Sequence, residues 1–226
     1  MPHPMNILIV FAHPEPQSFN GALVRTAVAA FEAAGHAVQV SDLYALPFEP
    51  SSDRRNFTTV RDAAFYKQQA EELYAAEHDG FAADIETELQ KLAWADVMIW
   101  QFPLWWFSVP AVLKGWVDRV FAMGRAYGNG RLYENGPFQG KRALLSLTTG
   151  GGAADYLPTG LQGELAGILR PIHRGMLQFT GFTVLAPHVV YGPARQSEAE
   201  REAALQAWAA RLPGLAAEAP LEVGAY

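Results

Sequence analysis

The sequence contains no cysteine, which excludes disulfides, thiolate chemistry and cysteine-ligated metals. It also lacks three common ligand signatures: the GxxxxGK[ST] phosphate loop, a GxGxxG after the first apolar run, and the HExxH zinc motif. The six histidines show no spacing typical of a metal site. We therefore expect no metal, and no nucleotide site of the P-loop or Rossmann type.

Positive charge is scarce as well: 17 Lys and Arg stand against 23 Asp and Glu, for a formal net charge of -6. Because phosphate contacts need clustered Lys and Arg, we expect no nucleic-acid partner. The N-terminal MPHPMNILIV lacks a basic region followed by a long apolar stretch. The longest apolar run, roughly 97–107, is too short to cross a bilayer. These features indicate a cytoplasmic protein without a membrane span.

Half of the residues are hydrophobic, and they fall into two alternating patterns. Short continuous apolar runs, typical of strands buried on both faces, lie at 6–12, 37–43, 96–102, 142–152 and 182–192. Helical patterns lie at 19–35, 81–94, 109–124 and 197–212, with a further one inside the polar segment 47–80. This alternation predicts an α/β fold, a doubly wound and mainly parallel sheet with helices on both faces.

Three loops leave the predicted strands at their carboxyl ends: HPEPQSFN (13–20), PLWWFSVP (103–110) and TTGGGAADY (148–156). Ligands bind at this edge of doubly wound sheets, so we expect the loops to form one site. The first loop opens a helix, whose unpaired N–H groups suit a phosphate. In TTGGG, the glycines leave N–H donors accessible to the polar edge of a planar ring.

The aromatic loop completes this pattern. Trp105, Trp106 and Phe107 taken singly would be ordinary core residues, but clustered beside Pro103 at the binding edge they make a stacking wall. Ser18 on its own is most simply a helix cap. Together the loops indicate a site with phosphate at one end and a planar heteroaromatic ring at the other. A flavin fits this description better than an adenine nucleotide alone.

Several segments, in this order, resemble one family. The chain is similar to the FAD-dependent NAD(P)H:quinone oxidoreductases, the DT-diaphorase group, in AHPEPQSFN, SDLYALPFEP, QFPLWWFSVPAVLKGWVDRVF, LTTGG and HRGMLQFTGFTVLAP. The resemblance covers roughly residues 6–212 and implies a flavodoxin-like fold with a five-stranded, mainly parallel sheet. It further implies a single domain over 1–226, with an insertion at about 47–80 and a C-terminal extension at about 192–226.

The resemblance also implies roles for individual residues. At the FAD diphosphate and ribityl chain it places His13, Ser18, Phe19 and Asn20, and around the isoalloxazine Pro103, Leu104, Trp106 and Phe107. At the polar edge of the ring it places Thr148, Thr149, Gly150, Gly151 and Tyr156, and near the adenine Arg201 and Leu205. The substrate pocket would contain Tyr127, Asn129 and Phe179. FAD is thus expected rather than FMN, with NADH or NADPH as co-substrate.

The activity implied by the resemblance is hydride transfer from NADH or NADPH through bound FAD to a quinone, in two half-reactions at one pocket. A homodimer is expected, with the active site at the interface. The expected catalytic residues are Tyr156 and Gln162. Gln162 departs from the family, where a histidine stands, and it cannot transfer a proton near neutral pH. Asn129 replaces a family tyrosine, which predicts a wider pocket mouth.

Two other functions stay open. An azo- or nitroaromatic reductase would share the flavin chemistry and differ in pocket shape. A flavin-binding regulatory subunit of a potassium-efflux system would bind without turnover, although such subunits tend to be shorter. Of the remaining histidines, His36 follows the first predicted helix and is expected at the surface, and His173 is expected to lie outside the substrate pocket.

Overall fold

Six parallel strands form one central sheet in the computed structural model, which describes residues 4–224. They are β1 (Asn6–Phe11), β2 (Ala37–Asp42), β3 (Val97–Pro103), β4 (Arg142–Thr149), β5 (Thr183–Val184) and β6 (His188–Tyr191). The order across the sheet is β2–β1–β3–β4–β5, and β6 also pairs with β4. The prediction of a mainly parallel sheet is confirmed: the pairings between these strands are all parallel, so their carboxyl ends share one edge.

The last predicted strand, 182–192, is divided into β5 and β6. Both segments pair with β4, Thr183 beside Arg142 and His188 beside Ser146. Between these two pairs the 182–192 segment is one residue longer than β4, which makes a bulge. Pro187 lies at the break and has no N–H to donate to the ladder. The sheet therefore keeps the predicted number of strand positions, with the last one interrupted.

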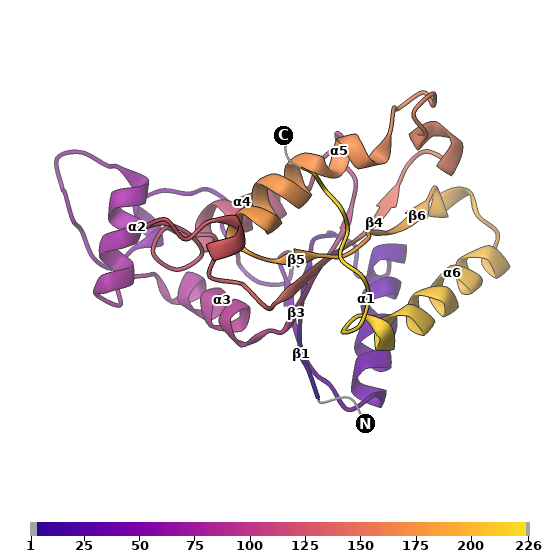
Figure 1. Ribbon diagram of the computed structural model, residues 1–226, viewed down its shortest axis with the longest axis horizontal. Coiled ribbons are helices and arrows are strands. Elements are labelled where there is room, and N and C mark those ends of the chain that lie inside the picture. Colours follow the sequence, from indigo (N-terminus) through magenta and orange to yellow (C-terminus); the bar gives the residue numbers. More distant parts are fainter. Residues whose placement is uncertain (1–3, 225–226) are drawn as a thin grey trace.

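Helices cover both faces of the sheet (Figure 1). They are α1 (Phe19–Ala33), α2 (Gln68–Glu77), α3 (Ala83–Trp94), α4 (Ala111–Val120), α5 (Leu165–Ile172) and α6 (Glu198–Arg211). The first and last pack on one face, and α3, α4 and α5 pack on the other. Periodicity predicts all of these except α5. The sequence pattern does not predict α5, because Pro171 interrupts the helical periodicity and the chain continues in a π-helical turn, His173–Leu177.

Side chains of β1 alternate between the two faces, as the period of a strand requires. Ile7 and Ile9 pack with α1 and α6, whereas Leu8 and Val10 belong to the apolar cluster with α3 and α4. Trp208 of α6 is fully buried, and its indole nitrogen donates to a carbonyl of α1 at 3.1 Å. The C-terminal helix is therefore fixed against the first one.

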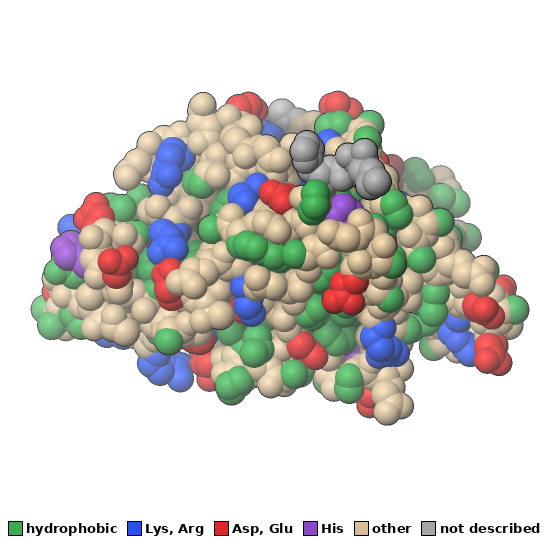
Figure 2. All heavy atoms as spheres, turned by 90° about the horizontal axis from the view of Figure 1, so that it is seen from below, with side chains coloured by type: hydrophobic (Ala, Val, Ile, Leu, Met, Phe, Trp, Pro, Cys, Tyr) green, Lys and Arg blue, Asp and Glu red, His purple; other side chains and the backbone are tan. Residues whose placement is uncertain are grey.

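Charges of both signs are mixed on the molecular surface. Figure 2 shows Lys and Arg side chains interspersed with Asp and Glu over the face that it presents. Nucleic-acid-binding surfaces carry clustered positive charge, and the face in Figure 2 shows no such cluster. Within residues 4–224, no helix has the length and apolar character needed to span a membrane.

His36 is buried, contrary to the expectation from the sequence. Only 8% of its surface is exposed, its Nδ1 accepts a hydrogen bond from the Met5 N–H at 3.0 Å, and its ring meets Phe31 edge-on. Gly35, at φ +80°, reverses the chain after α1 and turns His36 back onto the helix. The local pattern marks the helix end but not the direction that the chain takes afterwards.

His173, which is buried, and His188, which is half-buried, each have a buried Nε2 with no hydrogen-bond partner among residues 4–224. His173 lies in the π-helical turn and is 3% exposed, and His188 stacks on Trp208 with ring centroids 4.3 Å apart. Burial lowers the pKa of each imidazole to about 4, and the charge of Arg211 adds to this at His188. Both rings are therefore neutral at pH 7, and their protonation opposes the folded state.

Replacing His173 with Gln should reduce the loss of stability in acid. Because the folded pKa lies below the unfolded value, the contribution of His173 is complete above about pH 6.5 and is lost as pH falls toward 4. Between pH 7.5 and pH 5, His173→Gln should lose about 2 kcal/mol less unfolding free energy than the wild type. Urea titrations at both pH values measure this difference, and equal losses in the two proteins would contradict it.

Candidate functional site

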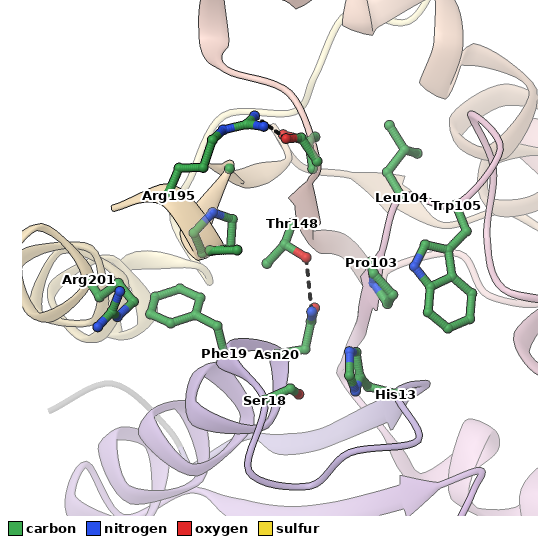
Figure 3. Close-up of a pocket in the computed structure, with 15 residues that line it drawn as sticks. His13, Ser18, Phe19, Asn20, Pro103, Leu104, Trp105, Thr148, Arg195 and Arg201 are labelled. Carbon is green, nitrogen blue, oxygen red and sulfur yellow. Dashed lines mark hydrogen bonds between the residues drawn. The ribbon is translucent and has the colours of Figure 1, made fainter. Parts of the chain in front are cut away.

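A cavity of about 560 Å³ opens at the carboxyl edge of the sheet (Figure 3). Four segments line it: His13, Ser18, Phe19 and Asn20 after β1; Pro103, Leu104 and Trp105 at the end of β3; Thr148, Thr149 and Gly150 at the end of β4; and Gly192, Pro193, Ala194, Arg195 and Arg201. The three loops selected from the sequence therefore meet at one place. The fourth segment, 192–201, runs from the end of β6 into α6.

The loop after β1 holds the first turn of α1 at the cavity. The Ser18 hydroxyl caps the helix by accepting a hydrogen bond from the Gly21 N–H at 3.1 Å. The His13 Nδ1 lies 3.0 Å from the Glu15 nitrogen, which leaves Nε2 for another partner. Gly21 permits the close approach of the loop, because a Cβ there would lie 2.0 Å from the Pro16 carbonyl oxygen. An anion at this helix start would meet unpaired N–H groups, a hydroxyl and an imidazole.

Asn20 connects the three loops. Its amide nitrogen donates to the Thr148 hydroxyl at 2.9 Å, and its amide oxygen accepts from the Gln101 side chain at 2.8 Å. All three side chains are buried. Because Gln101 belongs to β3 and Thr148 to β4, the start of α1 is tied to the ends of both strands. Gln101 is a contributor that the sequence analysis missed.

The loop after β4 presents free backbone donors. The carbonyl oxygens of Thr149, Gly150 and Gly151 each accept a hydrogen bond, from the Gly192 N–H at 3.0 Å, the Arg195 guanidinium and the Thr149 hydroxyl at 2.8 Å, respectively. Within residues 4–224, the N–H groups of Gly150 and Gly151 have no acceptor. A Cβ at Gly150 would meet no atom within 4 Å, so the edge of a planar ligand can reach the main chain.

Trp106 and Phe107 do not line the cavity. Trp105 and Ser108 exchange backbone hydrogen bonds of 3.1 and 3.0 Å around them, which makes a tight two-residue turn. Trp106 and Phe107 have φ of +49° and +57°, a left-handed conformation that bulky side chains rarely adopt. Trp106 is 95% exposed and Phe107 48%, whereas Trp105 lines the cavity in their place. Backbone strain of this kind is concentrated at ligand-binding segments.

Other residues predicted for the site lie outside the cavity lining: Gly151, Tyr156, Gln162 and Leu205. Tyr156 is buried, with its ring 5.8 Å from that of Tyr191. The Gln162 N–H donates to the Asp155 carbonyl at 2.8 Å, which folds this loop back toward Tyr156. Leu205 packs into the apolar cluster between α1 and α6.

Tyr127 and Phe179 form a second site, separate from the large cavity. Their ring centroids are 5.7 Å apart, and both line a cavity of about 210 Å³ that also contains Glu72. Burial raises the pKa of the Glu72 carboxyl and that of the Tyr127 phenol. Asn129, at φ +55°, lies in the turn after Tyr127. His173 lines a third cavity, of about 280 Å³.

Sequence reasoning missed the fourth wall of the large cavity, residues 192–195, because it treats 192–226 only as an extension. A signal for it exists. Gly192 and Pro193 form a turn-favouring pair directly after an apolar run, which places them at the carboxyl edge. No group of three or more His, Asp and Glu side chains in the described part of the chain could hold a metal ion.

Comparison with known proteins identifies the family to which this fold belongs. A family model described as a flavodoxin-like fold matches residues 5–212. The chain is 43% identical to human ribosyldihydronicotinamide dehydrogenase [quinone] over 221 residues, covering 97% of this chain and 96% of that protein. It is also 43% identical to NAD(P)H dehydrogenase [quinone] 1 of Cavia porcellus over 215 residues, covering 95% of this chain and 78% of that protein.

A solved structure agrees with these relatives. A crystal structure from Klebsiella pneumoniae, assigned as a quinone reductase, superposes with a TM-score of 0.92 at 42% identity, covering 96% of this chain and 86% of that one. The chain therefore belongs to the flavodoxin-like family. Within it, the chain groups with the NAD(P)H:quinone oxidoreductases, and the resemblance found in the sequence motifs is confirmed.

Replacing Gly21 with Ala should destabilise the entry to α1. The new Cβ would lie 2.0 Å from a backbone carbonyl oxygen, so the loop must move, and overpacking of this kind typically costs ~1–3 kcal/mol. Gly167→Ala is the matched control, because Gly167 is also the third residue of its helix and has no atom within 4 Å of its Cβ position. There Ala should be neutral or stabilising, by up to ~1 kcal/mol. Chemical denaturation compares the two variants, and equal stabilities would contradict the steric argument.

Proposed function

We propose that this protein is a flavin-dependent oxidoreductase that passes hydride from a reduced nicotinamide to a quinone. The observation that carries the proposal is the cavity at the sheet edge, with an open helix start and two glycine N–H groups that have no acceptor among residues 4–224. Fixed backbone donors suit a ring that gains negative charge on reduction. The names of relatives at 43% identity, which state quinone reduction, support the same chemistry.

The residues around the cavity fit a flavin. The helix start with His13, Ser18 and Asn20 suits the phosphates. The segment 148–151 offers N–H donors to the polar edge of the ring, and 103–104 offers an apolar wall beside it. A bound flavin supplies the capacity to take up and release hydride, whereas the chain binds it, orients it and sets its electrostatic surroundings.

We assign FAD rather than FMN to this cavity. Residues 192–201 extend the lining with two arginines, and Figure 3 shows Arg201 next to Phe19 on the side away from Trp105. The Arg201 guanidinium and the Phe19 ring suit the second phosphate and the adenine of a dinucleotide. Leu205 lies one helical turn after Arg201 on α6 and packs into the apolar cluster beneath this part of the cavity lining.

The donor is proposed to be a reduced nicotinamide, with NADH and NADPH as the first candidates. The relatives' names add a third, because they state both NAD(P)H and ribosyldihydronicotinamide. Donor and acceptor are proposed to use one pocket in turn, since both are flat and both must approach the same ring. The acceptor is a quinone, and an azo or nitro compound is the alternative.

We propose that the working protein is a homodimer in which the partner completes each active site. Trp106 and Leu161 are 95% and 86% exposed, and Phe107 and Leu157 are 48% and 54% exposed. Large apolar side chains exposed in the loops after β3 and β4 mark an interaction surface. In one chain, Tyr127 lines a cavity other than that of the cofactor. A second copy can bring this residue, with Asn129 and Phe179, over the flavin.

Tyr156 and Gln162 are the residues that we assign to the acceptor half-reaction. Tyr156 is 8% exposed and lies beside Gly151, whose Cβ position is 3.1 Å from the tyrosine ring. Its hydroxyl can therefore donate near the polar edge of the flavin. Gln162 can donate a hydrogen bond but not a proton. Protonation of the quinone then depends on the Tyr156 hydroxyl and on solvent.

The test is anaerobic mixing of the FAD-supplemented protein with NADPH, NADH or dihydronicotinamide riboside, followed by a quinone. Flavin absorbance should bleach with at least one donor and return on addition of the quinone, which establishes the two half-reactions and ranks the donors. A flavin that bleaches but is reoxidised only by azo or nitro compounds would transfer the assignment to that alternative. No bleaching with any donor would overturn the enzymatic function and favour the regulatory binding module.

Replacing Gln162 with His should accelerate the quinone half-reaction. General acid–base catalysis is typically worth 10²–10⁴-fold, and with Tyr156 already present we expect a gain of at least about tenfold in reoxidation rate. Bleaching by the donor should be unchanged. Gln162→Asn is the control, because it keeps the amide and adds no titratable group. Stopped-flow traces of the two half-reactions measure this, and equal reoxidation by both variants would remove Gln162 from the acceptor chemistry.

A further inference from the structure

Arg195 reaches the glycine loop from a distant part of the chain. It ends the short 3₁₀ turn Pro193–Arg195 that follows β6, and its own N–H donates to the Gly192 carbonyl at 2.9 Å. Its guanidinium donates to the Gly150 carbonyl across the cavity rim (Figure 3). Gly192, at φ +57°, makes room for this side chain, because a Cβ there would lie 3.2 Å from its Nη2.

The contact falls on the peptide unit that joins Gly150 to Gly151. The Gly150 carbonyl and the Gly151 N–H belong to the same planar amide and point in opposite directions. Arg195 occupies the carbonyl end, and the N–H end has no acceptor within residues 4–224. A hydrogen bond from a cation is stronger than a neutral one, and it polarises the amide so that the opposite N–H becomes a better donor.

The charges around this loop do not all have the same sign. The Asp155 carboxylate accepts from the Gly152 N–H at 2.8 Å and lies 2.7 Å from the Cβ position of Gly151. A negative charge this close opposes the build-up of negative charge on a bound ring. Arg195 is the cation that touches the loop directly and offsets Asp155. The other arginine that lines the cavity, Arg201, donates instead to the Gln196 carbonyl.

We propose that Arg195 is a positioning residue that raises the reduction potential of the bound flavin, acting through the Gly150–Gly151 amide. This inference rests on the proposed function. A hydride brings two electrons and one proton, so the ring gains one negative charge when it accepts a hydride and no further proton. The polarised Gly151 N–H stabilises that charge and has little effect on the neutral oxidised ring. Arg195 therefore favours the reduced cofactor over the oxidised one.

The experiment compares cofactor affinity and midpoint potential in the FAD-loaded wild type and in Arg195→Gln. The preference for reduced over oxidised FAD should fall about three- to tenfold, which is about 15–30 mV in a two-electron midpoint potential. Arg195→Lys keeps the charge and should lose less than half as much. Arg195→Met removes the charge at similar length and replaces the glutamine variant if that protein is unstable. Dye-equilibrated reductive titration gives the potential, and quenching of FAD fluorescence gives the affinity of the oxidised state.

Arg142→Gln is the matched control. Arg142 also donates from its guanidinium to a backbone carbonyl, that of Glu218 at 2.7 Å, but it does so at the amino end of β4. This variant should keep the wild-type potential. A shift of equal size in Arg142→Gln would show that the effect is general and would overturn the proposal.

The outcomes separate this inference from the function on which it rests. Equal weakening of oxidised and reduced FAD in Arg195→Gln leaves the potential unchanged, which would make Arg195 merely structural and overturn the inference alone. Wild-type affinity of Arg195→Gln for both oxidised and reduced FAD would also overturn the inference alone. If the wild-type protein holds no flavin, the proposed function fails, and the role of Arg195 fails with it.

Discussion

The buried side chain of Asn20 is the contact on which the arrangement of the cofactor edge depends. Its amide nitrogen donates to the Thr148 hydroxyl on β4 and its amide oxygen accepts from Gln101 on β3, while its backbone lies in the first turn of α1. Breaking either bond would leave a buried polar group unpaired, at a cost of about 1–3 kcal/mol. The helix start that suits phosphate and the loop that suits the ring are therefore held at one separation. A long cofactor needs such a fixed span, because its two ends are recognised by different segments.

Much of the proposed recognition is carried by main chain rather than by side chains. The carbonyl groups of 149–151 are occupied by protein donors, so the N–H groups of Gly150 and Gly151 remain for a ligand. Backbone donors stay in place when a side chain elsewhere in the site, such as residue 162, is replaced. With the roles proposed above, the family chemistry can therefore persist with glutamine at position 162. In this proposal, the reduction potential of the cofactor is adjusted by side chains that bond to the carbonyl groups of the loop, as Arg195 does at Gly150.

The alternation of apolar runs and amphipathic helices correctly predicts the parallel sheet, its two helical layers and the convergence of three loops at one edge. Each of those features depends on a period or a cap that is complete within a few residues. The predictions that fail concern features that depend on the course of the chain beyond a local sequence pattern. Pro171 hides α5, the bulge at 185–187 divides the last strand, and the turn at Gly35 buries His36.

The sequence by itself determined the class of fold, the edge of the sheet that carries the site and most of the residues that line it. Tertiary structure decided which residues meet. Gln101 bonds to Asn20 across 81 positions and Arg195 to Gly150 across 45, and no local pattern encodes either pair. It also decided that Trp105 faces the cavity while Trp106 stays exposed, because the hydrogen bonds across the turn impose left-handed backbone there. Local spacing records the period and the ends of an element, whereas contacts between distant residues depend on the order of strands and the course of the loops between them.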